Sequence, residues 1–257
     1  MCEPKFFDVD YDINPWMTKN KNQVNKSLAN KQWFDLVSAV SRSAVVQLVN
    51  AVEALPDLVF TANAGLVCKN QVVLSKFSKP QRSPEEQYFK KWFEDHGFNV
   101  FQPQNSYEGE GDHLIDCYQR HWLGSGFRSN PMVADELASF LGTKISILRM
   151  VDPRWYHLDT CFCPLPQGEL LWYPQAFDEP SREIINQAFE KQIQTSLEDA
   201  LAFACNCIVL GMNLFIPQNN AVSPALEALG YRVQSFDLSE FIKSGGAAKC
   251  LTLSLDR

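Results

Sequence analysis

The stretch SPEEQYFKKWFEDHGFNVF, residues 83–101, contains the local unit from which the fold is predicted. Ser83 precedes a proline and two glutamates, a pattern typical of a capped helix start with proline at its first position. Aromatic residues then recur at helical spacing between positions 88 and 93. Gly97 ends the helical pattern, and residues 98–101 follow as a strand. The stretch therefore predicts a helix followed directly by a strand.

The same order of helix, stop and strand recurs on both sides of this stretch. Of the four other helix-to-strand units, two also have a glycine at the end of the helix, and two match the pattern less well. The predicted helices are 23–42, 83–97, 132–141, 181–194 and 223–229, and the clearest following strands are 45–49, 98–101, 144–148 and 231–236. Five junctions about 50 residues apart favour a cyclic or layered α/β domain of repeated units, although an ordinary α/β sheet has similar spacing.

The composition is that of an ordinary globular protein, with 257 residues, 46% hydrophobic and 21% charged. No Pro/Ser-rich linker or charge block divides the chain, so residues 1–257 are predicted to form a single domain. No apolar run approaches the ~20 residues of a membrane helix, and no signal peptide follows Met1. We therefore expect no membrane partner and a cytoplasmic location. The net charge of −7 argues against a nucleic-acid partner and is compatible with a cationic substrate.

Eight cysteines are present without a signal peptide, which favours reduced thiols over a disulfide scaffold. The pairs CFC (161–163) and CNC (205–207) lack the two-residue gap that is usual in zinc knuckles. The four histidines include no H-x-x-x-H ligand pair. Buried cysteines that serve as small hydrophobic residues are the favoured interpretation, and no metal or cofactor is expected. A metal-binding protein that uses the two pairs stays as an alternative.

The first chemically suggestive segment is SGGAAKCLTLSL, residues 244–255. Small residues let the backbone approach a ligand closely, and an alternating strand is expected to begin directly after Cys250. A thiol at the mouth of a strand is accessible, and its thiolate form is nucleophilic. For this segment alone, an inert cysteine at a strand end is the commoner case.

The second segment is WYHLDTC, residues 155–161. In an extended conformation His157 and Asp159 point the same way, which suits a general acid/base beside a carboxylate that binds a cation. A His-x-Asp pair that simply hydrogen-bonds at the surface is the alternative.

Two further segments combine glycine with polar residues. YEGEGD, residues 107–112, places three carboxylates among two glycines, which favours a cationic ligand or else an acidic surface turn. It lacks the spacing of an EF-hand. FTANAG, residues 60–65, offers Asn63 as both donor and acceptor, or else as an asparagine turn between two strands.

In this order the four segments resemble the guanidino-group-modifying enzymes of the pentein superfamily, which include arginine deiminases, dimethylargininases and glycine amidinotransferases. The chain is most similar to the arginine dihydrolase part of bifunctional arginine dihydrolase/ornithine cyclodeaminase proteins. The residues that carry this similarity are 8–17, 59–67, 156–164 and 245–253. The resemblance implies a five-bladed α/β propeller with pseudo-fivefold repeats and the active site on its axis.

The resemblance also implies a role for each motif residue. Cys250 matches the nucleophile and His157 the general acid/base. Asp159 and Glu108 match carboxylates that hold the guanidinium. Asn63 stands where many deiminases have a second guanidinium-binding aspartate. The remaining matches are to substrate-binding positions: Asn14 and Arg128 for the amino-acid end of the substrate, with Phe60 and Asp112 beside them.

The implied reaction is the conversion of arginine to ornithine, ammonia and carbon dioxide through a covalent cysteine intermediate. Compared with the dihydrolases, the chain starts near the end of the first expected strand, so the first blade is expected to be incomplete. It carries no cyclodeaminase part, so ornithine and not proline is the expected product. The resemblance is compatible with a homo-oligomer.

Three other activities use the same residue types: a deiminase that releases citrulline, an amidinotransferase and a dimethylargininase-like hydrolase. A non-catalytic relative, like the ribosome anti-association factors of the superfamily, is a further alternative. The joint presence of Cys250, His157, Asp159 and Glu108 favours an enzyme over that alternative.

Overall fold

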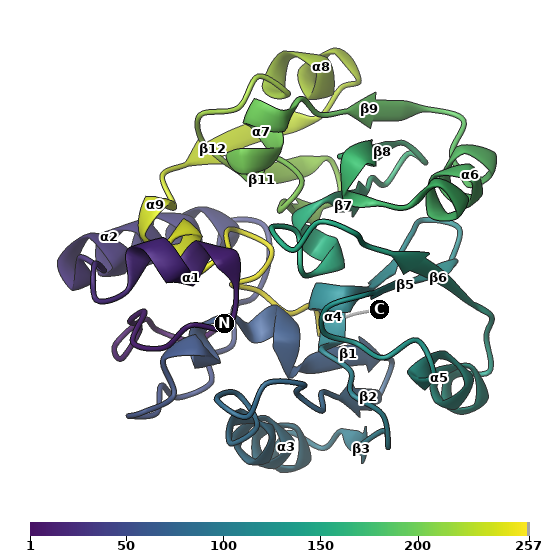
Figure 1. Cartoon of the computed structure of the whole chain (residues 1–257). Helices are drawn as coiled ribbons and strands as arrows, with labels where there is room; N and C mark the ends of the chain where they lie inside the picture. The colour runs from purple at the N-terminus through teal and green to yellow at the C-terminus, as the bar shows by residue number, and fades with distance from the viewer. Residues whose placement is uncertain (256–257) are drawn as a thin grey trace.

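The computed structural model describes residues 1–255 and contains four three-stranded sheets that share one topology. In each sheet the first two strands are antiparallel, and a third strand pairs parallel to the second, which is central. Figure 1 shows the sheets arranged around a common centre, with the longer helices outside them. In chain order the units are β1 (Gly65–Cys68), β2 (Gln71–Leu74), α3 (Glu85–Asp95) and β3 (Asn99–Phe101); β4 (His113–Ile115), β5 (His121–Ser125), α5 (Val133–Leu141) and β6 (Ile145–Arg149); β7 (Phe162–Pro164), β8 (Leu170–Trp172), α6 (Glu179–Ala188) and β9 (Gln192–Gln194); and β10 (Ile208–Leu210), β11 (Asn213–Pro217), α8 (Ser223–Ala228) and β12 (Arg232–Phe236).

Three of the predicted helix-to-strand junctions are confirmed, those around α3, α5 and α8. Helix α5 ends at Gly142, whose φ of +66° is a left-handed conformation that favours glycine. The capping box predicted at Ser83 is wrong, because α3 begins at Glu85 without a side-chain cap. The carboxylate of Glu86 instead accepts hydrogen bonds from the backbone of Phe77 and the side chain of Gln102, so tertiary contacts outcompete the local cap.

The helix predicted over residues 181–194 is too long at its C-terminal end. Helix α6 starts after Asp178, whose side chain accepts a hydrogen bond from the backbone of Ser181, and it ends at Ala188. Residues 192–194, predicted as helix, form β9 beside β8. The sequence Gln-Ile-Gln carries little strand signal, and its pairing with the buried β8 decides its conformation.

The fifth unit is much reduced compared with the other four. Its helix is α2 (Lys26–Val40), but residues 45–49, predicted as a strand, contribute one parallel bridge between Val49 and Cys2. Leu253 and Leu255 pack against the hydrophobic cluster that contains Cys2. The strand predicted directly after Cys250 is wrong, since no strand is assigned in residues 251–255. This part of the molecule is therefore held by packing and a few backbone hydrogen bonds.

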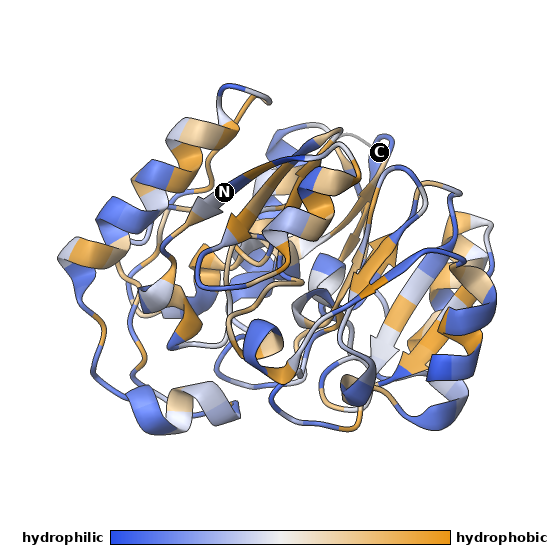
Figure 2. Cartoon of the chain, turned by 90° about the horizontal axis from the view of Figure 1, so that it is seen from above, coloured by the Kyte–Doolittle hydropathy of each residue, from blue (hydrophilic) through white to orange (hydrophobic). Residues whose placement is uncertain are grey.

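The core consists of hydrophobic clusters between the sheets and the outer helices. Figure 2 shows strands that are largely hydrophobic and helices that carry hydrophilic residues on part of their surface. None of the helices in the described part of the chain is long and apolar enough to cross a membrane. The remaining helical segments are short connections: α1 (Pro15–Asn20), η1 (Pro56–Val59), η2 (Thr61–Ala64), α4 (Gly109–Asp112), η3 (Leu158–Thr160), η4 (Pro174–Ala176), α7 (Leu197–Leu201) and α9 (Ser239–Ile242).

Candidate active site

A small pocket near the centre of the molecule collects most of the residues that the sequence predicts for the site. It lies between η2, the turn that follows α9, and the segment before η3. Its volume is about 10 Å³, room for roughly one water molecule. The predicted residues that line it are Asn14, Phe60, Asn63, Arg128, His157 and Cys250.

Glu108, at the start of α4, is fully buried beside this pocket and has contacts to both carboxylate oxygens. Oε2 lies 2.7 Å from Nε2 of His157 and 3.1 Å from Nη1 of Arg128. Oε1 accepts hydrogen bonds from the backbone and the hydroxyl of Ser78, at 3.1 and 2.8 Å. Burial alone would raise the pKa of Glu108, but Arg128 and His157 outweigh it and hold the pKa well below its usual range. The carboxylate is therefore ionised, and it orients the imidazole.

Cys250 contacts the other predicted carboxylate. Its Sγ lies 3.2 Å from Oδ2 of Asp159 and donates to it. Burial, together with the nearby Asp159, raises the pKa of the Cys250 thiol well above its usual value. Burial also raises the pKa of Asp159 to about 7, against the opposing effect of Lys249. Without a ligand Cys250 is thus a thiol. A negative charge on Asp159 is only weakly stabilised by its surroundings.

The segment around Asp159 is not extended, as the sequence suggested, but forms the 3-10 turn η3. Thr160 closes this turn, because its hydroxyl donates to the carbonyl of His157 at 2.6 Å. Asp112 supports the turn from α4, since its Oδ1 accepts from the backbone of Leu158 at 3.2 Å. His157 and Asp159 consequently reach different partners, Glu108 and Cys250.

Asp112, which the resemblance assigned to substrate binding, does not line the pocket. Its second oxygen accepts hydrogen bonds from the backbone and the hydroxyl of Ser129, at 3.1 and 2.6 Å. Its carboxylate is fully buried and used inside the protein. The structure therefore places Asp112 behind the site, where it joins α4 to η3 and to the loop that carries Arg128.

Asn63 is held between two neighbours at the pocket wall. Nη1 of Arg82 donates to its Oδ1 at 2.8 Å, and its Nδ2 donates to the carbonyl of Glu108 at 3.0 Å. A Cβ at Gly111 would stand 2.2 Å from the Asn63 nitrogen, so glycine is required there for α4 to pack this closely. The acidic-glycine segment is thus a buried helical turn and not an acidic surface turn.

The two residues predicted to bind the amino-acid end attach the N-terminal segment to the pocket. Oδ1 of Asn14 caps α1, and its Nδ2 donates to the carbonyl of Ser244 at 3.0 Å. Nη2 of Arg128 donates to the carbonyl of Ile13 at 3.1 Å, and its guanidinium lies 4.5 Å from the ring centre of Tyr156.

No family model matches the chain. It is 46% identical, over 98% of its length, to the bifunctional arginine dihydrolase/ornithine cyclodeaminase AgrE of a Nostoc species and 45% identical to ArgZ of a Synechocystis species. The chain spans 37% of the length of these curated relatives. It is also 34% identical to the N(G),N(G)-dimethylarginine dimethylaminohydrolase of Mycobacterium tuberculosis, covering 99% of this chain and 84% of that protein.

Among solved structures, the N-terminal domain of ArgZ bound to its substrate superimposes with a TM-score of 0.98 at 44% identity, covering 100% of this chain and 97% of that one. The chain belongs to the guanidino-group-modifying enzymes of the pentein superfamily. A dimethylarginine dimethylaminohydrolase from Pseudomonas aeruginosa, 22% identical with a TM-score of 0.79, has the same fold.

Three residues that line the pocket of this pentein chain, Asp57, Arg82 and Ser244, escaped the sequence analysis. Tyr11 donates to Oδ2 of Asp57 at 2.7 Å, and Ser244 donates to its Oδ1 at 3.2 Å. Arg82 forms a buried ion pair with Glu85 at 2.8 Å. Asp57 and Arg82 occur in segments without a glycine or histidine motif, and Tyr11 and Ser244, although they lie in motif segments, contact Asp57 from positions distant in the sequence. The one available signal was an aspartate, Asp57, directly before the apolar run that leads to Phe60.

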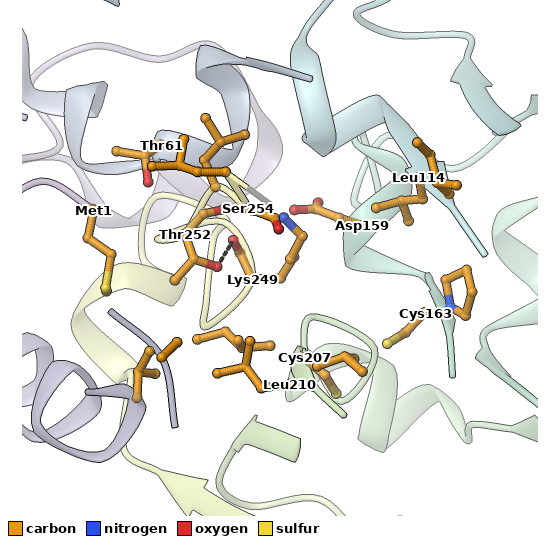
Figure 3. Close-up of a pocket in the computed structure, with 18 of the residues that line it drawn as sticks. Met1, Thr61, Leu114, Asp159, Cys163, Cys207, Leu210, Lys249, Thr252 and Ser254 are labelled. Atoms are coloured by element: carbon orange, nitrogen blue, oxygen red, sulfur yellow. Dashed lines mark hydrogen bonds between the residues drawn. The ribbon is translucent and has the colours of Figure 1, made fainter. Parts of the chain in front are cut away.

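In this pentein chain Asp159 is not among the residues that line the small pocket; it lines a second, larger cavity of about 820 Å³. Figure 3 shows Asp159, Lys249 and Ser254 near one another at this cavity, with Cys207 and Leu210 below them. Nζ of Lys249 lies 2.5 Å from Oε2 of Glu110. The cysteines of the two C-x-C pairs are buried, and no metal-binding group of His, Cys, Asp and Glu occurs within residues 1–255.

Proposed function

We propose that this chain hydrolyses arginine to ornithine, ammonia and carbon dioxide, and that residues 1–257 form one catalytic domain for this reaction. The observation that carries the proposal is a single pocket lined by both Cys250 and His157, with an ionised Glu108 holding the imidazole. Support comes from the N-terminal domain of ArgZ, an arginine dihydrolase with structures bound to its substrate and to its product. A cytoplasmic location is part of this proposal, and the buried thiols of the two C-x-C pairs support it.

A guanidinium is planar, cationic and weakly electrophilic, so the site has to bind it with carboxylates and present a thiolate to its central carbon. In this proposal the bound cation favours the ionised form of Asp159, next to Cys250. Arg128 and Asn14 bind the amino-acid end of arginine. Because the pocket has room for about one water molecule, arginine enters when the covering segments move, namely those at Asn14 and at 244–246.

The first half of the reaction replaces one nitrogen by oxygen. The Cys250 thiolate forms a bond to the guanidinium carbon, and the departing ammonia takes a proton from His157. Neutral His157 then removes a proton from water, which attacks the same carbon and breaks the C–S bond to give citrulline. In the second half the thiolate attacks the ureido carbon and expels ammonia or ornithine. A second water then breaks the C–S bond, and the resulting carbamate divides into carbon dioxide and the other amine. In total, arginine and two water molecules give ornithine, two ammonia and one carbon dioxide.

Asn63 decides in this proposal whether citrulline stays bound for the second half. A carboxylate at position 63 would accept hydrogen bonds from a guanidinium but would repel the ureido oxygen. The amide nitrogen of Asn63 has a second hydrogen besides the one that it donates to Glu108, and it can donate that hydrogen to the ureido oxygen. Arg82 fixes the orientation of the amide through Oδ1.

The test is mass analysis of the products from isotopically labelled arginine. The wild type is expected to release two ammonia for each ornithine, and Cys250→Ser is expected to lose turnover. Asn63→Asp is expected to shift the product toward citrulline, whereas the exposed Asn186→Asp, with the same change of charge, leaves the ratio unchanged. Citrulline as the end product of the wild type would indicate a deiminase. The proposal would be refuted if methylated arginine were the only substrate turned over. It would also be refuted if arginine reacted only when an amine acceptor was present.

A further inference from the structure

Asn206 lies beneath the nucleophile, in the second of the two cysteine pairs. It belongs to the loop between α7 and β10, and it is 0% exposed. The loop turns at Phe203, whose φ of +59° is left-handed, and the backbone N–H of Asn206 donates to the carbonyl of Phe203 at 2.9 Å. A non-glycine residue in that conformation indicates that surrounding contacts hold the loop in place.

The side chain of Asn206 makes four hydrogen bonds. Oδ1 accepts from the backbone N–H of Ala247 at 3.1 Å and of Cys250 at 3.2 Å. Nδ2 donates to the carbonyl of Asp159 at 3.1 Å and to Sγ of Cys250 at 3.1 Å. An amide has two donor hydrogens and one oxygen with two lone pairs, so this set uses its full capacity.

These contacts fix the turn that carries the sulfur at both of its ends. Residues 247–250 form no helix or strand, so no regular ladder of hydrogen bonds positions Cys250. Oδ1 of Asn206 binds the backbone at the start and at the end of this turn. The backbone carbonyl of Asn206 accepts a hydrogen bond from the backbone N–H of Lys249 at 3.2 Å. From the opposite side, the backbone N–H of Ala62 donates to the carbonyl of Cys250 at 3.1 Å.

Asn206 also has an electrostatic effect on the sulfur. Burial and Asp159 raise the pKa of the thiol, while hydrogen bonds from the backbone of Ala247 and from Asn206 lower it. While the proton is on the sulfur, Sγ donates to Asp159. Once the proton has left and Asp159 is ionised, Asp159 offers the sulfur no hydrogen, but Nδ2 of Asn206 still points a donor at it. A donor to a buried anion is worth more than a donor to a neutral group.

We propose that Asn206 is a catalytic residue of this site, which donates a hydrogen bond to the Cys250 thiolate and sets the direction from which the sulfur attacks. This inference rests on the proposed function, because it assumes that Cys250 attacks a substrate carbon. If Asn206 only holds the turn in place, the two hydrogen bonds that Oδ1 accepts from Ala247 and Cys250 are sufficient. The catalytic role also requires the hydrogen bond that Nδ2 donates to Sγ of Cys250.

Asn206→Asp separates the two roles. Its carboxylate accepts from Ala247 and Cys250 as before, but in its ionised form it places a negative charge at the sulfur in place of a donor. The readout is the rate at which chloroacetamidine, a small planar cation, alkylates Cys250 at pH 7 to 9, measured by mass analysis of the peptide that contains this residue. We expect alkylation of Cys250 and kcat with arginine to fall about 10- to 150-fold, the range for a lost hydrogen bond to a charged group. The rise of both rates with pH should move to higher pH.

Asn186→Asp, an exposed change on α6 with the same charge, serves as the matched control and should leave both rates unchanged. Alkylation of Asn206→Asp at the wild-type rate, in a variant that unfolds cooperatively, overturns the inference. Should this variant fail to fold, Asn206→Ala, which adds no charge, is measured with the same criterion. Alkylation does not depend on the substrate, so a wild type that is inactive on arginine refutes the proposed function and leaves this test intact.

Discussion

The two buried carboxylates beside the pocket are in opposite electrostatic conditions. Glu108 has hydrogen-bond donors on both oxygens, from Ser78, Arg128 and His157, and its pKa is lowered. Asp159 has one oxygen against Cys250, while its Oδ1 accepts no hydrogen bond from residues 1–255, and its pKa is raised to about 7.

This difference teaches that the protein itself stabilises the charge of Glu108. The charge of Asp159 lacks such stabilisation. Glu108 is ionised without a ligand and holds His157 in position, which is preorganisation. The charge of Asp159 becomes favourable when a cation lies next to it. A guanidinium would therefore supply the missing partner on the Cys250 side.

The largest expected effect comes from Glu108→Gln. This change leaves Arg128 buried without its anionic partner and gives His157 a neutral amide in place of a carboxylate, so the free energy of unfolding should fall by about 3–5 kcal/mol. Urea unfolding at pH 7 measures it. Turnover should also be lost, because the imidazole is no longer oriented. A variant as stable as the wild type would mean that the charge of Glu108 is not needed for the fold.

Asp159→Asn should reduce activity without the loss of stability. The near-isosteric amide keeps a polar group beside Cys250 but cannot attract a guanidinium, so kcat/KM for arginine should fall about 10- to 150-fold. The free energy of unfolding at pH 8 should stay equal or rise, since a poorly compensated buried charge is removed. A large loss of stability in this variant would abolish the contrast with Glu108.

The pH dependence of stability tests the same contrast in the wild type. The folded pKa of Asp159 is raised, so between its ordinary value of 3.8 and about 7 the folded chain keeps a proton that the unfolded chain has lost. The stabilisation from this proton is full below the ordinary value and is lost as pH rises through 7. Glu85, raised to about 7, and Asp112, raised to about 6, add to this effect, while the contribution of Glu108 is lost as pH falls.

Urea unfolding at pH 5, 6 and 7 should therefore show a smaller fall of stability with pH in Asp159→Asn than in the wild type. The difference in slope is at most about 1.4 kcal/mol per pH unit, the value for one proton. Identical slopes would show that the carboxyl of Asp159 ionises in the folded chain at its ordinary pKa.

The smallest effect on activity is expected for Lys249→Met. Lys249 lowers the pKa of Asp159, so its removal should move the acid limb of kcat/KM for arginine to higher pH, by less than about one unit for a partly solvated charge. Rate measurements from pH 5.5 to 9 would detect the shift. The exposed Lys191→Met provides the control, and a shift of equal size there would remove the special role of Lys249.

The sequence predicted the repeated helix-to-strand units where periodicity and a stop residue agreed, as around Gly142 and Gly230. It failed where distant partners decide the local conformation. Residues 45–49 and 251–255 alternate like strands but lack the neighbours that would complete a sheet. Glu86 fits a capping box in the sequence, yet its carboxylate is bound to Phe77 and Gln102.

For the site, the motifs predicted Cys250, His157, Glu108 and Asn63, because glycine and polar residues mark those segments. They did not predict Arg82 or Asn206, whose contacts arise only when separate units of the chain meet. In the sequence CNC the cysteines were considered as candidate ligands. In the structure it is the asparagine between them, Asn206, that contacts the sulfur of Cys250.

Asp159 also lines the 820 Å³ cavity behind the site, whose wall includes the widely exposed Val45. A molecule that fills the front pocket therefore leaves the rear of this carboxylate facing a space that reaches the surface. The contact between Cys250 and Asp159 thus stands between the two pockets, with the sulfur in the wall of one and the carboxylate in the wall of the other.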